Sequence, residues 1–382
     1  MSKNQVTLKE QLRKFSLKSI IGYHTILIYG MGTRLGIFDY LYNKVQELHN
    51  SGKITSISFS FNELIEKLNL APKYLDSWIQ MALECGIFEL DNPAEKSLKT
   101  APYVYEILID KNNMVYIGGL LAVNYFTSFI NQERFEFFKT GQVIDMISLD
   151  IIPEDLRKEI LIISSQNGAI KGKSLERIYS KYFKEHMKNL RKEGAILEVG
   201  CGCGYTLKHW AKKFKKTRLV GIDIDPLPLE HSKSMIEENK LNDRVEIHVT
   251  TTNKYCQENK NQFDVVILNE VLHEMDPNEQ YRINALTDIY NLLKDDGILM
   301  IGEYMIPDTF TPKTKFQFFE VWVKWVETPF PSSFYNEESI KNLFKSTPFK
   351  TVELIRDGRD YCCVAKKQPA LKMINEVSQI LS

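Results

Sequence analysis

The chain has 382 residues, which is enough for two domains with separate hydrophobic cores. Its 49 basic and 49 acidic side chains cancel, so the net charge favours neither a nucleic-acid partner nor a membrane surface. We find no signal peptide and no transmembrane segment, and the six cysteines have neither disulfide-framework nor zinc-ligand spacing. We therefore expect a cytoplasmic protein with reduced thiols and no metal site, although residues distant in sequence could still converge.

The first 150 residues have the pattern of a mostly α winged-helix domain. Ser60-Phe-Asn-Glu63 is a capping box that starts one helix. A second helix follows the turn at Leu70–Pro72 and stops at Gly86. Strand Ile87–Leu90 and the polar stretch Asp91–Lys99 complete the predicted wing.

A winged helix also suggests DNA binding, and charge argues against that interpretation. A DNA-reading helix carries lysine and arginine to neutralise phosphates. Here Lys73 opens the second helix, but Asp76 and Glu84 follow it. We therefore expect no nucleic-acid partner.

The apolar run Val115–Phe126 comes next in the chain. It is shorter than the ~20 residues of a membrane span, and Asn124 interrupts it. It predicts a buried helix, either as plain core or with rings that reach a ligand pocket together with Phe129 and Phe135. Residues 151–193 are charged and helical in pattern, and we interpret them as a connector.

The most informative stretch begins at Ala195, where an apolar run ends in Glu198 and is followed by Gly200, Gly202 and Gly204. This pattern predicts a buried strand that turns sharply into a helix, with glycines that let a ligand approach the backbone. Nineteen residues beyond Gly204 a second apolar strand ends in Asp223. That spacing places a carboxylate at the ribose hydroxyls of a nucleotide in a doubly wound fold.

The glycine spacing argues against a dinucleotide. A dinucleotide site has Gly-x-Gly-x-x-Gly, and the carboxylate of Glu198 would repel a pyrophosphate. A cationic ligand fits better, and the motif resembles that of class I S-adenosylmethionine (SAM)-dependent methyltransferases. The resemblance implies SAM as cofactor, bound by Glu198, the three glycines and Asp223, with contributions from Ile224, Thr251 and Asn269.

Strands and helices alternate through residues 194–382, which predicts a mostly parallel sheet covered on both faces. The predicted fold class is α/β, a Rossmann-like doubly wound sheet of seven strands. The strands are predicted at 195–198, 218–223, 244–249, 263–269, 298–303, 350–355 and 361–366. The last two are predicted to form an antiparallel hairpin at the edge.

Three polar residues follow strand ends in the second half of this sheet: Asn269, His273 and Glu303. A neutral imidazole can take a proton from an acceptor hydroxyl, and a carboxylate can orient the imidazole. The alternative is that His273 only donates hydrogen bonds beside the cofactor, because methyl transfer can proceed by orientation alone.

This region resembles the small-molecule O-methyltransferases of plants and their bacterial relatives. The resemblance implies that His273 is the catalytic base and that Glu303 brackets it. It also implies a homodimer formed through the N-terminal domain, which caps the acceptor site. The chain departs from the family at Thr251 (an acid in the family), at Met275 (an aromatic residue) and at Ser333, which aligns with a second bracketing glutamate.

The segment Phe316–Tyr335 contains eight aromatic residues and lies where such enzymes cover the acceptor. It predicts an aromatic pocket for a flat or apolar small molecule, or a helix that buries its rings in an interface. We favour O-methylation of a small acceptor. C-methylation beside a keto group, N-methylation, protein or peptide methylation, and a winged-helix regulator that senses SAM remain open.

Overall fold

A computed structural model of the protein describes residues 8–13, 18–47, 56–113, 115–128, 131–144, 154–309, 318–357 and 360–367. Residue contacts divide the chain into two compact units, Met1–Gln132 and Glu133–Ser382. None of the described helices combines the length and the apolar character needed to cross a bilayer.

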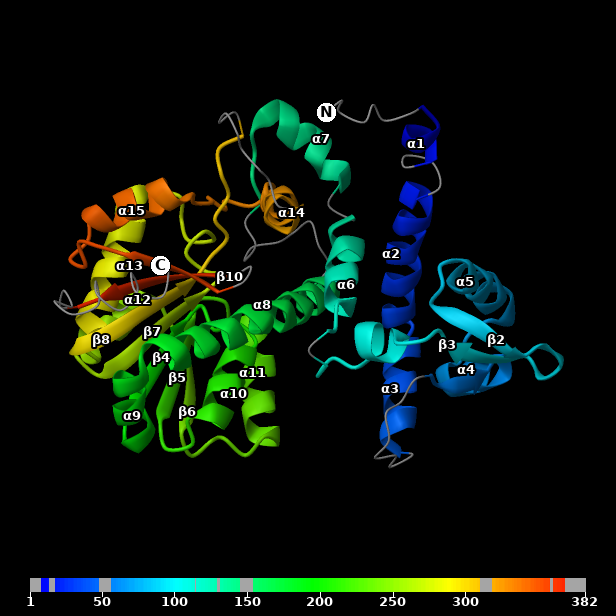
Figure 1. Ribbon diagram of the computed structural model, residues 1–382, viewed down its shortest axis with the longest axis horizontal. Helices are drawn as coiled ribbons and strands as arrows, with labels where there is room; N and C mark the ends of the chain where they lie inside the picture. Colours follow the sequence, from blue (N-terminus) through cyan, green and yellow to red (C-terminus); the bar gives the residue numbers. More distant parts are fainter. Residues whose placement is uncertain are drawn as a thin grey trace, which may run out of the picture. The chain divides into compact units, whose positions relative to one another are not determined.

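The N-terminal unit is mainly helical and contains one small sheet (Figure 1). Its elements are α1 (Leu8–Arg13), α2 (Ser19–Arg34), α3 (Ile37–Glu47), β1 (Ser58–Ser60), α4 (Phe61–Leu68), α5 (Pro72–Glu84), β2 (Phe88–Asn92), a 3₁₀ turn (Pro93–Glu95), β3 (Ser97–Thr100), a π-helical turn (Tyr105–Ile109) and α6 (Gly118–Thr127). The three strands have the order β1-β3-β2, and both pairings are antiparallel.

The capping box predicted at the start of α4 is present. The Ser60 side chain accepts a hydrogen bond from the backbone of Glu63, and the Glu63 side chain accepts one from the backbone of Ser60. The predicted strand after Gly86 is β2. The polar stretch behind it forms the turn into β3.

The apolar run after residue 114 is buried only in part. Val115 is 57% exposed and Ile117 is 47% exposed, so the prediction of a buried helix is wrong for the start of the run. Helix α6 begins at Gly118, where a β-carbon would lie 2.0 Å from the Tyr29 hydroxyl. Helix α6 is therefore packed closely against Tyr29 from its first residue. Phe129 lies outside the described residues.

The C-terminal unit is built on the predicted α/β sheet. Its helices are α7 (Asn131–Thr140), α8 (Glu154–Tyr182), α9 (Lys184–Lys192), α10 (Tyr205–Lys213), α11 (Pro226–Glu238), α12 (Thr252–Glu258), α13 (Glu279–Leu292), α14 (Phe318–Glu327) and α15 (Glu337–Lys345). Its strands are β4 (Ala195–Val199), β5 (Arg218–Asp223), β6 (Val245–Val249), β7 (Phe263–Asn269), β8 (Leu293–Gly302), β9 (Glu353–Asp357) and β10 (Asp360–Lys366).

The seven strands have the order β6-β5-β4-β7-β8-β10-β9. The first five are parallel, and β10 is antiparallel to both β8 and β9, so the predicted edge hairpin is confirmed. One apolar cluster packs α12, α13 and α15 on one face, and a second packs α8 to α11 on the other (Figure 1). The doubly wound fold is therefore confirmed. Cys362 and Cys363 lie in different clusters because successive strand residues face opposite sides.

Strand β8 begins earlier than predicted. The sequence pattern predicts that the preceding helix closes at Asp-Asp-Gly297 and that the strand begins at Ile298, but the strand already starts at Leu293, which pairs with Phe263. The pairing then shifts register before Ile298 pairs with Val265. The register shift lets Asp-Asp-Gly297 remain within the strand instead of forming a break before it.

Candidate active site at the carboxyl ends of the strands

The predicted glycine loop leaves β4 and enters α10. Gly200, Gly202 and Gly204 have φ angles of 70°, 47° and 75°, a region that favours glycine. A β-carbon on Gly200 would lie 2.5 Å from the Val271 side chain, and one on Gly204 would lie 2.3 Å from Ser232 Oγ. The loop therefore requires these glycines for both backbone conformation and packing.

Asp223 joins the end of β5 to this loop. Its Oδ2 accepts a hydrogen bond of 2.8 Å from the Gly202 amide, and its Oδ1 accepts one of 3.0 Å from the Asp225 amide. Burial raises the pKa of Asp223, against the lowering effect of these amides. The next residue, Ile224, is 52% exposed. The loop and this acid therefore form one site at the ends of β4 and β5.

Glu198 is a buried carboxylate near the carboxyl end of β4. It is 2% exposed, and its Oε2 has no hydrogen-bond partner among the described residues. Burial raises its pKa well above the usual value; the Thr206 side chain counteracts this and the charge of Asp223 adds to it. A buried carboxylate in this condition is stabilised by a cation or by hydrogen-bond donors, so it could hold a positively charged ligand.

Two further predicted cofactor residues have structural partners. The Thr251 hydroxyl accepts a hydrogen bond of 3.3 Å from the Lys254 amide and caps α12. The Asn269 amide group donates to the Gly168 carbonyl at 2.9 Å and to Thr206 Oγ1 at 3.2 Å. Its Oδ1 is buried and has no partner among the residues that the structure describes.

The predicted pair of His273 and Glu303 is assembled and buried. His273 Nδ1 lies 2.7 Å from Glu303 Oε2, and the His273 amide donates to Glu303 Oε1 at 3.1 Å. Both residues are 1% exposed. Burial alone would lower the pKa of His273, but Glu303 and Glu327 raise it well above 6.5. Burial would likewise raise the pKa of Glu303, but His273 holds it below its usual value.

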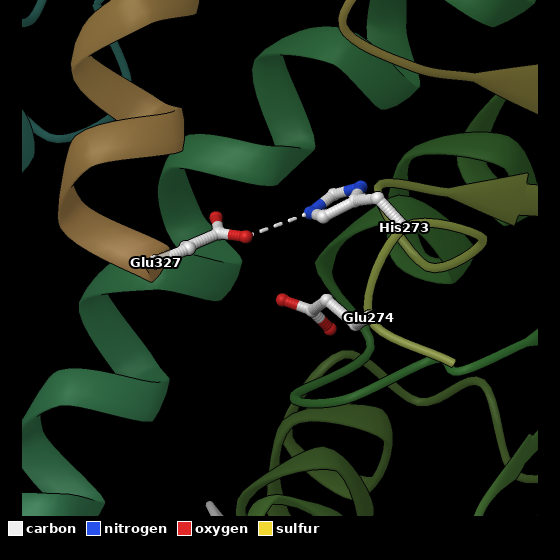
Figure 2. Close-up of side chains that lie close together, drawn as sticks. All are labelled: His273, Glu274 and Glu327. Atoms are coloured by element: carbon white, nitrogen blue, oxygen red, sulfur yellow. Dashed lines mark ion pairs between the residues drawn. The ribbon is translucent and has the colours of Figure 1, made fainter. Parts of the chain in front are cut away.

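A second carboxylate, which the sequence analysis missed, faces the other ring nitrogen. Glu327 Oε2 at the end of α14 lies 3.0 Å from His273 Nε2 (Figure 2). The expectation that Ser333 occupies this place is wrong. The Ser333 amide instead donates to the His273 carbonyl at 2.8 Å. The imidazole is therefore bracketed by two carboxylates.

The backbone around His273 is held by a buried arginine. Arg282 is 3% exposed and donates hydrogen bonds to the carbonyls of His273 (3.2 Å) and Met275 (2.7 Å). It also donates to the Tyr335 hydroxyl at 2.6 Å. These bonds tie the turn after β7 to the segment after α14, so the imidazole is fixed from both sides.

A third group of charges lies beside the imidazole. Lys171 Nζ from α8 lies 3.2 Å from Glu270 Oε1 and 3.3 Å from the centre of the Tyr304 ring. The Tyr304 hydroxyl donates to the same Glu270 oxygen, and its ring centre is 6.1 Å from that of His273. Glu270 has a φ of 60°, which is uncommon for a residue other than glycine.

The rings of the predicted aromatic segment differ in how far they are buried. The Phe334 ring is stacked on His273 with centroids 4.9 Å apart. Trp325 is 49% exposed and Phe318 is 75% exposed, so these rings are not packed in the core. Phe316 lies outside the described residues. Phe334 is thus one ring of this segment that lies against the imidazole.

Comparison with known proteins agrees with this fold. Residues 197–299 match a family model described as a methyltransferase domain. A 126-residue segment is 27% identical to the ribosomal protein L11 methyltransferase of Thermosipho africanus (strain TCF52B). That match covers 33% of this chain and 42% of the relative, so the chain spans less than half of the curated protein that it matches.

Solved structures resemble almost the whole chain. An O-methyltransferase family protein from Burkholderia thailandensis has a TM-score of 0.65 at 14% identity, covering 96% of this chain and 100% of that one. Human N-acetylserotonin methyltransferase in complex with SAM has a TM-score of 0.68 at 13% identity, covering 97% and 100%. At such identities the likeness shows the fold. Together with the family match over residues 197–299, it shows that the C-terminal unit has the fold of class I methyltransferase domains.

Proposed function

We propose that the protein is a SAM-dependent methyltransferase that acts on a small-molecule acceptor, with O-methylation as the favoured reaction. The observation that carries the proposal is the placement of two groups on one sheet edge. Glu198, a buried carboxylate with an unpartnered oxygen, lies near the carboxyl end of β4, and the bracketed imidazole of His273 follows the adjacent β7. Ligands of open α/β sheets bind beyond this edge.

The residues present fit SAM. The unpartnered Glu198 oxygen suits a cationic group of the cofactor, the glycine loop leaves room for close approach, and Asp223 lies where ribose hydroxyls would meet it. When bound, the cofactor supplies an electrophilic methyl group on a sulfonium. Ile224, Thr251 and Asn269 complete the proposed cofactor residues.

On the acceptor side, His273 would accept the proton that leaves the attacking hydroxyl, at its Nε2 atom. Glu303 holds the opposite nitrogen and stabilises the protonated ring. Glu327 lies close to Nε2 and would favour the same protonated form. Proton removal from a carbon beside a keto group would use the same groups, so C-methylation is the alternative. N-methylation and methylation of a protein or peptide require only the cofactor half of the site.

We further propose that the N-terminal unit is a winged helix that forms a homodimer rather than binding DNA. Helices α4 and α5 followed by the β2–β3 hairpin support the winged-helix assignment. The exposed side of α5 carries Lys73 together with Asp76 and Glu84, which gives no basic surface. A regulator that only senses SAM would instead show salt-sensitive duplex binding. The free cysteines support our proposal of a cytoplasmic location.

The test is product analysis with methyl-labelled SAM and a panel of phenols, enolisable ketones and amines. We expect labelled methyl ethers from the wild type and a large loss of kcat in His273→Asn, with the affinity for SAM nearly unchanged. Labelled methyl on a carbon or nitrogen atom would show that the enzyme catalyses C-methylation or N-methylation instead of O-methylation. A His273→Asn variant with wild-type turnover would show that the imidazole is not the base, and no transfer to any acceptor would contradict the proposed chemistry.

A further inference from the structure

Three ligand-type side chains converge beside the bracketed imidazole. One potential ligand atom each from His273, Glu274 and Glu327 lies within 4.8 Å of the other two. His273 and Glu274 follow β7, whereas Glu327 ends α14, and their polar groups face a common space (Figure 2). Because these residues are up to 54 positions apart (327 − 273), no sequence spacing predicts the group.

The group contains buried atoms that lack hydrogen bonds. His273 is 1% exposed, and neither its Nε2 nor Glu327 Oε2 has a hydrogen-bond partner among the described residues. These two atoms are 3.0 Å apart but are not aligned as donor and acceptor. Two ligands of one zinc ion have a similar separation, roughly 3 to 3.5 Å for bonds of about 2.1 Å. The pair is therefore spaced as two ligands of one cation are.

Glu274 adds a carboxylate that nothing in the described part of the chain neutralises by an ion pair or hydrogen bond within the usual distances. Two carboxylates so close to each other repel unless a proton or a cation lies between them.

The opposite side of the ring has the partner that a metal-binding histidine requires. Metal-ligating histidines donate their other ring N–H to a carboxylate, which fixes the tautomer and the ring orientation. Glu303 lies 2.7 Å from Nδ1 and can accept that proton. Nε2 then faces Glu327 Oε2 at 3.0 Å, on the side where Glu274 also lies. Arg282 holds the carbonyls of His273 and Met275, so the ligand-bearing turn is already fixed.

We propose that His273 Nε2, Glu274 and Glu327 bind one divalent cation, with Zn²⁺ preferred. Three protein ligands with an open fourth position form a common zinc arrangement, and an imidazole ligand favours zinc over magnesium. This site is independent of the proposed cofactor site. If the proposed function holds, a bound cation occupies the His273 Nε2 lone pair, which otherwise takes the proton from the hydroxyl of the methylated molecule. Zinc binding and methyl transfer then exclude each other.

The test is a calorimetric titration of the chelator-treated full-length protein with ZnCl₂, and separately with MgCl₂. We expect one zinc site whose affinity falls at least tenfold in Glu274→Gln and in Glu327→Gln, and much weaker binding of magnesium. Glu274→Gln removes a charge from an exposed side chain, so it is expected to fold normally. His248→Ala is the matched control, because His248 and Glu246 form a surface pair 3.5 Å apart that a nonspecific zinc ion would also bind.

The readout separates this proposal from the proposed function, because binding is measured without cofactor or acceptor. Zinc affinity that depends on Glu274 and Glu327 but not on His248 supports the site, whether or not methyl transfer is found. Binding that is unchanged in both glutamine variants, or no saturable zinc binding at all, overturns it.

Discussion

His273 Nδ1 and Glu303 Oε2 lie 2.7 Å apart in a place where neither residue is more than 1% exposed. The two residues follow adjacent parallel strands, β7 and β8, so their meeting is a direct consequence of the sheet order. The contact fixes the orientation of the imidazole ring. It leaves the second ring nitrogen, Nε2, on the side where we propose that it takes a proton.

Loss of this contact should change stability in a pH-dependent way. The folded-state pKa of His273 is raised above 6.5, so its contribution is complete below that pH and is lost as pH rises through the folded value. The pKa of Glu303 is lowered, so its contribution exists above about 4.5 and is lost as pH falls through the folded value. Glu303→Gln should therefore reduce the free energy of unfolding by about 3 to 5 kcal/mol near pH 6, with a smaller difference at alkaline pH. Urea denaturation from pH 5 to 10 measures this, and a pH-independent difference would contradict it.

The second bracketing carboxylate should move the pH dependence of catalysis. Because Glu327 raises the pKa of His273, the free imidazole becomes available only at higher pH. In Glu327→Gln, the acid limb of kcat/KM should shift to lower pH. Glu338→Gln, a change at an exposed glutamate of α15, is the control and should leave the profile unchanged. An unshifted acid limb in Glu327→Gln would show that this carboxylate does not act on the imidazole.

The glycine loop should tolerate no β-carbon at Gly200. Gly200→Ala places a side chain 2.5 Å from Val271 at a φ of 70°. Strain and overpacking together should cost a few kcal/mol and should abolish SAM binding. Gly86→Ala is the matched control, since it has the same φ but nothing within 4 Å of the new atom. It should cost only about 1 to 2 kcal/mol. Equal losses in the two variants would mean that conformation alone, and not close packing, requires the glycine.

Cofactor binding should release a proton from Glu198. The pKa of this carboxyl is raised well above its usual value by burial, and a bound cation favours its ionised form. The heat of SAM binding should therefore vary between buffers of different ionisation enthalpy. In Glu198→Gln the variation should disappear and the affinity should fall. Buffer-independent heat in the wild type would show that Glu198 is already ionised or does not meet the cofactor.

Residues at strand ends were predictable from sequence because a buried parallel strand fixes where its last polar residue lies. Glu198 and Asp223 lie within the last two positions of β4 and β5, Glu303 directly follows β8, and His273 lies four residues after β7 ends at Asn269. Glu327 was missed because its position depends on how α14 packs, and no local pattern aligns that helix.

Lys171 was missed for a related reason. It comes from α8, about 100 residues before Glu270, the residue it contacts (270 − 171 = 99). Similarly, the start of β8 was misplaced because Asp-Asp-Gly297 is a turn pattern by composition, whereas pairing with β7 keeps it in the strand. In each case a tertiary contact decided what the local sequence left open.

The central claim is that the loop from Glu198 to Gly204, closed by Asp223, holds the methyl donor. Titration of the wild-type protein with S-adenosylhomocysteine in a calorimeter tests it most directly. We expect saturable binding of one molecule per chain, weakened at least tenfold in Asp223→Ala. A wild-type protein that gives no binding heat at any temperature tested would contradict the claim.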